Sequence, residues 1–307
     1  MGRLGRAALL VVGACLLALV GLSGCLATAQ TEAVTLGLAA PFEGARRDLG
    51  YAVLGAVRLA IAEQNAAGGW RGRPVTLAAL NDEDEPAQAR LRARELSIDP
   101  SVIAVVGHWS WAATAAALPV YQAAGLRLVV PVAGGPALED ERILRLAPGD
   151  DELARVAVEY ARQAGYRRIL LRVEPAALRS ALEVALPAAG IQIGDERPDA
   201  AFLWLDDEAT ARFLRAGEPR PVLLLSAPYL PLLAKLAPLN DPRIVTWVLE
   251  PAEPHALAAF EAAYAARAGQ RPAPQARLAY LAARVALGAP ASGWRLRFAP
   301  AGALLAP

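Results

Sequence analysis

Short apolar segments alternate with helix-forming segments along most of this chain. Val34–Ala39, Val75–Leu80 and Ile103–Val106 are apolar runs of strand length, and helical patterns lie between them at about 50–66 and 86–96. A chain that alternates in this way builds a parallel sheet, because each helix returns the chain to the same end of the next strand. We therefore expect an α/β fold with helices on both faces of a parallel sheet.

The alternation restarts near Leu144–Pro148. Asp150 or Asp151 can cap a new helix, and Gly165 can end it. The elements expected after this point are helices at about 150–164, 176–189, 254–268 and 278–287, and strands at about 168–173, 200–205, 222–226, 244–249 and 294–298. The sequence thus predicts two doubly wound lobes that are joined near residues 145–150 and crossed again later.

The N-terminal segment has the features of a bacterial export signal. Arg3 and Arg6 precede an uncharged apolar segment, residues 7–20, which is too short to be a stable membrane span. The segment ends in Leu22–Cys25, which resembles the lipobox of bacterial lipoproteins, in which the cysteine is acylated. We predict a signal peptide over residues 1–24.

Cysteine usage agrees with lipidation. Cys15 lies inside the signal, so Cys25 would be the only cysteine of the mature chain and could not form an internal disulfide. We predict lipidation of Cys25 and a short tether over residues 25–32. The alternative is an unpaired thiol left on an ordinary secreted protein.

Composition and motifs exclude several classes of function. The net charge is +1 and the arginines are scattered, which argues against a nucleic-acid partner. The two histidines, His108 and His255, have no cysteine or acidic residue at metal-ligand spacing, and the sequence has no P-loop, GxSxG elbow or GxGxxG after its first strand. We expect no enzyme, no metal and no cofactor, and we interpret His108 as a turn residue with satisfied hydrogen bonds.

Two acidic segments follow predicted strands. We interpret Asn81–Glu85 as a solvated turn that supplies an acidic cap to a helix beginning at Pro86. The same interpretation applies to Asp206–Glu208, although the end of a strand is also where α/β folds place ligands.

Three loops after first-lobe strands are expected to border a ligand cleft. They are Pro41–Ala45, His108–Trp111 and Val132–Gly135, and ligands of doubly wound folds bind beyond the carboxyl ends of strands. Trp109 and Trp111 are large side chains for a turn, and aromatic walls suit small-ligand pockets. We expect at least one of these indoles to face the cleft, and the alternative is that one or both pack beneath a neighbouring helix.

Two long segments carry a family resemblance: VTLGLAAPFEGARRDLGYAVLGAVRLAIAEQNAAGGWRGRPVTLAALNDEDEPAQA and VIAVVGHWSWAATAAALPVYQAAGLRLVVPVAGGPAL. With looser agreement in the second half, the mature chain resembles the leucine/isoleucine/valine-type solute-binding proteins of ABC importers. The resemblance implies a type I periplasmic-binding fold with two Rossmann-like lobes, three crossover strands and hinge closure on a ligand. We assign residues 33–145 and about 251–290 to one lobe, and 146–250 and about 291–307 to the other.

The sequence departs from the amino-acid binders of this family at the site itself. The family's binding serine and threonine align with Trp111 and Gly134, and Leu49 stands where an aromatic residue is frequent. The second-lobe loop that often holds an acidic group reads Ser226–Tyr229, which leaves Asp206 and Asp207 as acidic candidates. The resemblance and the strand-end rule together predict these ligand-binding residues: Phe42, Leu49, Trp109, Ser110, Trp111, Val132, Ala133, Gly134, Asp206, Ser226 and Tyr229.

The leading functional hypothesis is a bacterial, extracytoplasmic binding lipoprotein of an ABC importer. It would capture an amino acid or related solute with an apolar or aromatic body. Its partners would be the solute, the permease subunits and the membrane that holds Cys25, and we expect a monomer. Two alternatives stay open: an interaction lipoprotein of the same fold that regulates a membrane or cell-wall partner without a ligand, and a ligand sensor coupled to a receptor.

Overall fold

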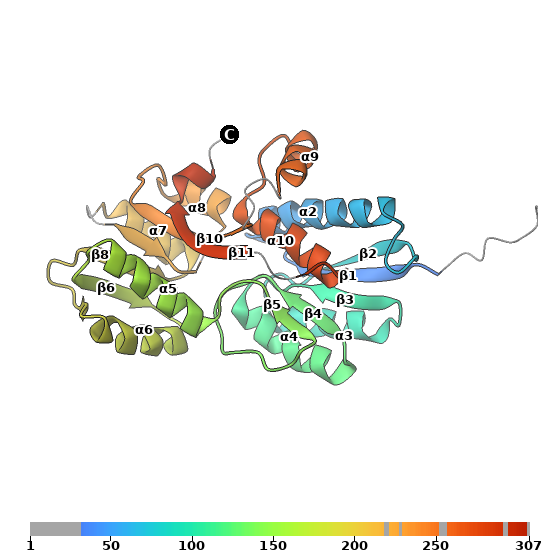
Figure 1. Ribbon diagram of the computed structural model, residues 1–307, viewed down its shortest axis with the longest axis horizontal. Coiled ribbons are helices and arrows are strands. Elements are labelled where there is room, and N and C mark those ends of the chain that lie inside the picture. Colours follow the sequence, from blue (N-terminus) through green and yellow to red (C-terminus); the bar gives the residue numbers. More distant parts are fainter. Residues whose placement is uncertain (1–31, 218–220, 227–228, 252–256, 291–293, 306–307) are drawn as a thin grey trace, which may run out of the picture. The chain divides into compact units, whose positions relative to one another are not determined.

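Two β-sheets organise the part of the chain that the computed structural model describes, which is residues 32–217, 221–226, 229–251, 257–290 and 294–305. The predicted signal peptide and Cys25 lie outside these residues. We call the elements that pack around each sheet the first lobe and the second lobe (Figure 1).

The first sheet has five strands in the order β2-β1-β3-β4-β5, and all its neighbouring strands are parallel. Its strands are β1 (Val34–Ala40), β2 (Val75–Asn81), β3 (Val102–Val106), β4 (Arg127–Val130) and β5 (Ile143–Arg145), and its helices are α2 (Arg47–Ala66), α3 (Pro86–Ile98) and α4 (Trp111–Ala124).

Both faces of the first sheet are buried. Leu36 and Val106 belong to a core that the sheet shares with α2, whereas Ala39 and Val105 belong to a second core with α3 and α4. Strands covered on both faces are continuously apolar, which is why the short apolar runs of the sequence identify them.

The second sheet has six strands in the order β11-β10-β9-β8-β6-β7. Its strands are β6 (Arg168–Val173), β7 (Gln192–Ile193), β8 (Ala200–Trp204), β9 (Val222–Leu224), β10 (Ile244–Pro251) and β11 (Trp294–Pro300), and its helices are α5 (Asp150–Gln163), α6 (Ala176–Ala188), α7 (Asp207–Arg215) and α8 (Leu230–Leu236). Phe202 faces a core shared with α5 and α6, and its neighbour Leu203 faces a core shared with α7 and α8. The strand β8 is therefore central and covered on both sides.

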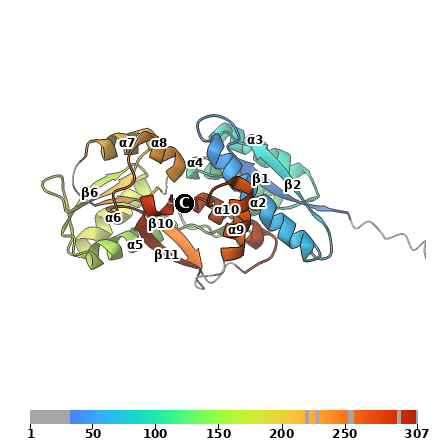
Figure 2. The same cartoon turned by 90° about the horizontal axis from the view of Figure 1, so that it is seen from above.

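The helices α9 (Ala258–Ala268) and α10 (Pro274–Ala286) follow β10 in sequence but lie against α2 of the first lobe (Figures 1 and 2). The ring of Tyr280 stacks on that of Phe260 at 4.1 Å between centroids, and both rings belong to the core of α2. Leu278, also on α10, packs instead into the second-lobe core. The chain returns to the second sheet as β11, which is followed by the short 3₁₀ helix η1 (Gly302–Leu304).

The predicted α/β architecture with two lobes is confirmed, with differences in detail. The edge strand β11 runs antiparallel to β10, with Phe298 opposite Trp247, whereas we expected parallel strands. The helices α7 and α8 were not predicted. The lobe boundaries assigned from sequence stay a prediction.

The interpretation of Asn81–Glu85 as a solvated turn is wrong for Asp82, which is fully buried. Its carboxylate is buried because it contacts the His108 ring, as described below. Glu85 occupies the N-cap position of α3 without a capping hydrogen bond from its side chain, and Pro86 is the first helical residue as expected. The cap interpretation of Asp206 is confirmed, since its Oδ1 accepts the Ala209 N–H of α7 at 2.6 Å.

Candidate binding site

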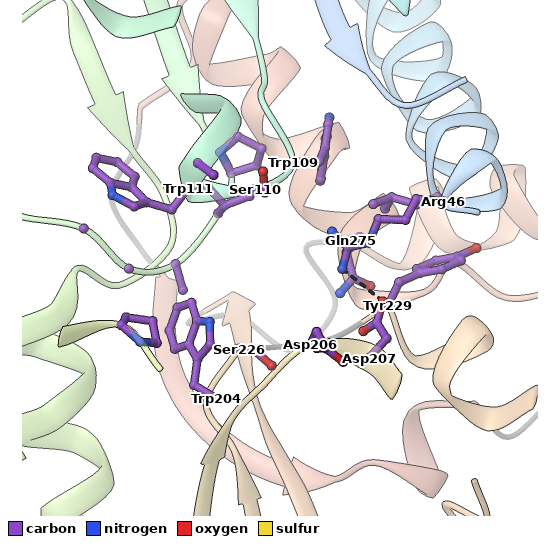
Figure 3. A pocket seen from close by; sticks show the side chains of 18 of the residues that line it. Arg46, Trp109, Ser110, Trp111, Trp204, Asp206, Asp207, Ser226, Tyr229 and Gln275 are labelled. Atoms are coloured by element: carbon purple, nitrogen blue, oxygen red, sulfur yellow. Dashed lines mark hydrogen bonds and ion pairs between the residues drawn. The ribbon is translucent and has the colours of Figure 1, made fainter. Parts of the chain in front are cut away.

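A cavity of about 590 Å³ lies at the carboxyl ends of strands from both sheets (Figure 3). Loops that follow β3, β4, β6, β8 and β9 contribute to its lining. Parallel strands present their carboxyl ends, and the helix starts that follow, at one edge of a sheet, and this edge is where doubly wound folds bind ligands. The volume is in the range of small-molecule sites.

Ten of the eleven residues predicted to bind a ligand line this cavity: Leu49, Trp109, Ser110, Trp111, Val132, Ala133, Gly134, Asp206, Ser226 and Tyr229. The eleventh, Phe42, is not among the described lining residues. Its ring packs against Tyr51 at 6.1 Å between centroids, and its N–H donates to Asn81 Oδ1 at 2.8 Å. Residues that are far apart in sequence therefore meet at the carboxyl ends of the strands, where the sequence analysis placed the ligand site.

Four tryptophans line the cavity. Trp109 and Trp111 come from the turn after β3, and Trp204 and Trp247 come from the second sheet. Figure 3 shows Trp109 and Trp111 on one side of the cavity and Trp204 on another. Both tryptophans of the first turn line the cavity, and Trp109, which is 5% exposed, also packs into the core around α2, which is the alternative left open for one of them.

Gly134 and Gly135 make room for two of these indoles. Both have a positive φ, +86° and +80°, which glycine adopts without a steric penalty. A Cβ on Gly134 would lie 2.7 Å from Trp204 Cη2, and a Cβ on Gly135 would lie 2.2 Å from Trp111 Cε2. The Arg145 guanidinium covers the Trp111 ring at 4.9 Å from its centroid. Gly134 therefore leaves open the space that the Trp204 ring occupies.

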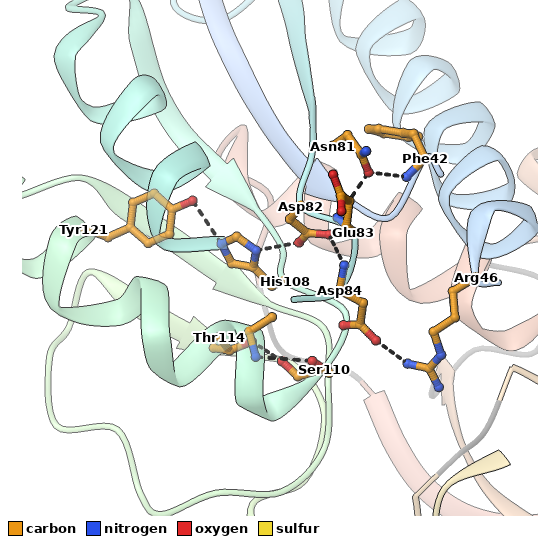
Figure 4. Close-up of polar contacts among 11 residues, drawn as sticks. Phe42, Arg46, Asn81, Asp82, Glu83, Asp84, His108, Ser110, Thr114 and Tyr121 are labelled. Carbon is orange, nitrogen blue, oxygen red and sulfur yellow. Dashed lines mark hydrogen bonds and ion pairs between the residues drawn. The ribbon is translucent and has the colours of Figure 1, made fainter. Parts of the chain in front are cut away.

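A buried hydrogen-bond network fixes the turn that carries Trp109 and Trp111 (Figure 4). The His108 Nδ1 lies 2.6 Å from Asp82 Oδ2, and its Nε2 lies 3.2 Å from the Tyr121 hydroxyl. Burial, followed by the charge of Asp82, raises the pKa of Tyr121, so this hydroxyl keeps its proton and can donate to the imidazole. His108 is a satisfied turn residue, as expected, with a partner that the sequence did not show.

The hydroxyl of Ser110 is engaged in the backbone of the turn. Its Oγ accepts the Ala113 N–H at 3.2 Å as the N-cap of α4, and its carbonyl accepts from the Thr114 hydroxyl at 2.8 Å. The cap stabilises the start of α4, whose first residues line the cavity.

Charged groups gather at another part of the lining. Arg46 Nη1 lies 2.7 Å from Asp84 Oδ2, and its Nη2 lies 3.3 Å from Asp207 Oδ2. Burial lowers the pKa of Arg46, but the two carboxylates outweigh that effect and raise its pKa above the usual value. Glu174 and Asp206 add carboxylates from the second lobe. Burial also raises the pKa of Tyr229 to about 12, and its hydroxyl donates to the Asp48 carbonyl at 3.2 Å.

Sequence reasoning missed several lining residues, among them Arg46, Glu174, Trp204, Trp247 and Gln275. Glu174 and Trp204 stand at the ends of predicted strands, so the rule that identified Trp109 could have identified them. Gln275 belongs to α10, which reaches the cavity from a distant part of the sequence that carries no local signal.

Metal clusters and membrane-spanning helices are absent from the described part of the chain. Among its residues, no group of three histidine, cysteine or acidic side chains is placed to hold a metal ion. No helix among the residues that the structure describes has both the length and the apolar character needed to cross a membrane.

The sequence matches one family model and, over part of its length, a curated protein. Residues 33–194, more than half of the chain, match the model of the family described as periplasmic binding protein. An amino acid binding protein of Pseudomonas aeruginosa is 32% identical over 138 residues, which are 44% of this chain and 37% of that protein. The chain therefore spans little more than a third of the length of this curated relative.

Solved structures share the fold over most of the chain. An ABC transporter substrate-binding protein from Desulfitobacterium hafniense, in complex with Leu, has a TM-score of 0.67 at 22% identity, over 89% of this chain and 88% of that one. A solute binding protein of an ABC transporter from Rhodopseudomonas palustris, in complex with 3,4-dihydroxybenzoic acid, has a TM-score of 0.69 at 20% identity, over 83% and 79%. These likenesses establish the type I periplasmic-binding fold with its two lobes.

The family and its structural neighbours are substrate-binding proteins, which confirms the expectation that this chain is not an enzyme. The family model covers the first lobe and the start of the second, and the fold likeness extends over the rest. The chain belongs to the periplasmic binding protein family.

Proposed function

We propose that the chain is the extracytoplasmic solute-binding component of an ABC importer. It captures a small organic solute, an amino acid or a related compound with a large apolar or aromatic body, between its lobes. The observation that carries this proposal is the cavity of about 590 Å³ lined by Trp109, Trp111, Trp204 and Trp247. Aromatic side chains combine large contact area with few rotatable bonds, so they bind flat apolar groups at low entropic cost.

The polar groups of the lining favour such a solute over a free branched-chain amino acid. The Ser110 oxygen accepts the Ala113 N–H as a cap, so only its O–H can donate to a solute; Trp111 stands where the resembled amino-acid binders carry a serine, and Gly134 has no side chain. A carboxylate would rely mainly on backbone N–H groups at the start of α4, because the one guanidinium of the described lining, that of Arg46, is already paired with Asp84 and Asp207. A buried charge with few donors is costly, so we expect weak binding of leucine and valine.

The chemistry of the relatives supports the two solute classes that we compare. One structural neighbour holds leucine and another holds 3,4-dihydroxybenzoic acid. The tryptophan-rich lining favours the aromatic class for this chain.

Lipid anchoring completes the proposed function. The lipobox-like Leu22–Cys25 and the lack of any other mature cysteine support acylation at Cys25. Two acyl chains give firm membrane attachment, at about 0.8 kcal/mol for each buried CH₂. The protein, a monomer on this proposal, would be held near the permease subunits. Cys25→Ser should release the protein from membranes in a fractionation experiment, and unchanged membrane retention would contradict lipidation.

An interaction lipoprotein that works without a ligand is not favoured. Such a protein has no need for an indole-lined cavity at the strand ends, and here that space is hollow.

The test is native mass spectrometry of the purified protein, followed by calorimetric titration with leucine, valine and a panel of aromatic acids. Trp111→Ala should weaken binding of the best aromatic solute at least about tenfold, because it removes one wall of the cavity. Trp70→Ala is the matched control, since Trp70 lies outside the cavity lining and is covered by Arg71. Micromolar leucine binding, or equal affinities for Trp111→Ala and the wild type, would contradict the proposal.

A further inference from the structure

The two lobes contact each other beside the cavity through a group of side chains that includes two ion pairs. Arg46 and Asp48, from the start of α2, face Asp207, Tyr229 and Lys235 of the second lobe. Arg46 pairs with Asp207 at 3.3 Å, and Lys235 Nζ donates to Asp48 Oδ2 at 2.8 Å. We call this set of five residues the rim contact.

Tyr229 gives the rim contact an apolar part. Its side chain is 4% exposed and belongs to the first-lobe core around α2, although the residue itself starts α8 of the second lobe. Its hydroxyl donates to the Asp48 carbonyl at 3.2 Å. Separation of the lobes would expose this ring to water, which costs free energy in proportion to the apolar area exposed.

Arg46 is held in position by its own lobe. Asp84 accepts from its Nη1 at 2.7 Å, and the Asp84 N–H donates to Asp82 Oδ1 at 3.0 Å. The other oxygen of Asp82 contacts His108, so the turn that positions Asp84 is tied to the buried network under Trp109 (Figure 4). Because Asp84 already fixes the Arg46 side chain, the contact between its Nη2 and Asp207 costs little further side-chain entropy.

The rim contact lies across the cavity from the turn that carries Trp111. Figure 3 shows Arg46, Asp207 and Tyr229 together on one side and Trp111 on the opposite side. Trp111 is in turn covered by Arg145, which directly precedes the segment that joins the two lobes. A contact on the far side of the cavity from this segment separates when the lobes rotate about it, so the rim contact opposes such a rotation.

We propose that the rim contact is a latch, in which Arg46 and Lys235 hold the lobes closed through the protein's own charges, and that a solute can enter or leave only when it opens. The latch goes beyond the proposed function, because it rests on the two-lobe fold and does not depend on which solute binds. It assigns Arg46 and Lys235 as positioning residues that set the balance between open and closed forms.

The test measures that balance with no solute added. The full chain, with Cys15→Ser and Cys25→Ser, carries spin labels at Ile98→Cys on α3 and Val184→Cys on α6, two exposed positions in different lobes. Electron–electron double resonance then gives the distribution of the distance between labels. The chain with latch residues intact should show a dominant short-distance population, and Arg46→Gln with Lys235→Gln should lower its closed-to-open ratio at least about fivefold.

Arg58→Gln is the matched control. Arg58 is an exposed arginine of α2, the helix that follows Arg46, and it lies outside the rim contact, so its loss should leave the distances unchanged. Asp207→Asn removes the same pair from the opposite lobe and should reproduce the effect of Arg46→Gln alone, which shows that the pair is responsible and not the folding of one variant.

Two results would overturn the latch. One is an unchanged distance distribution in the Arg46→Gln, Lys235→Gln double variant, and the other is an equal shift in Arg58→Gln. Failure of the proposed function is distinct, because it would appear as missing solute binding in calorimetry whatever the distances between labels show.

Discussion

The two sides of the cavity are built in different ways. The first-lobe turn with Trp109 and Trp111 lies on a fully buried network of His108 and Asp82. On the second-lobe side, Trp204 is the partly buried last residue of β8, and Asp206 in the loop that follows is exposed and caps α7 with one side-chain hydrogen bond. We therefore expect the first wall of the cavity, the turn after β3, to keep its conformation without a solute. The second wall, formed by Trp204 and the loop after β8, can adjust when a solute binds.

The difference in rigidity between the two walls is tested most strongly by removing one carboxylate from each. Asp82→Ala leaves the His108 ring and the Asp84 N–H without their buried acceptor, and we expect a loss of about 3 kcal/mol in the free energy of unfolding. Asp206→Ala removes an exposed N-cap and should cost about 1 kcal/mol. Urea denaturation followed by circular dichroism measures both values.

The two variants control for each other, since each removes an aspartate that follows a strand. Equal losses would show that the first wall is no more rigidly supported than the second, and the contrast between the walls would have to be abandoned.

The sequence predicted the fold well because its signals are local. The buried strands are short apolar runs, and their order along the chain implies parallel pairing with helices on both faces. The carboxyl ends of those strands located most of the cavity lining, including both tryptophans after β3. The helices α7 and α8 were missed because one is a nine-residue amphipathic helix and the other has only seven residues, both too short for a clear periodic pattern.

The partners of the site residues were not predictable in the same way. Nothing local in the sequence indicates that Asp82 is buried against His108, or that Arg46 lies between Asp84 and Asp207. These pairs join residues from different strands and lobes, and they depend on tertiary packing. Gly134 was noted only as a lost hydroxyl, because the indole that occupies the space in front of it comes from the other lobe.

Gly134 of the first lobe lies against Trp204 of the second lobe. A substitution here should have the smallest effect of those considered, and it tests directly which wall moves. Its φ is +86°, and an added Cβ would lie 2.7 Å from the Trp204 ring. Gly165 has a similar φ of +75° but open space around it, with nothing within 4 Å of an added Cβ. Gly134→Ala and Gly165→Ala should therefore share a backbone penalty of about 1 kcal/mol in the free energy of unfolding.

Only Gly134→Ala should also displace the Trp204 indole. We expect a change in tryptophan fluorescence and a weaker affinity for the aromatic solute in that variant, with neither change in Gly165→Ala. If the second wall adjusts as the comparison implies, Trp204 moves while the first-lobe turn stays in place, so the added removal of Trp204 by Trp204→Phe should abolish the fluorescence difference. A difference that persists in the Trp204→Phe background would mean that the alanine disturbs the first-lobe tryptophans, and that the first wall is not the rigid one.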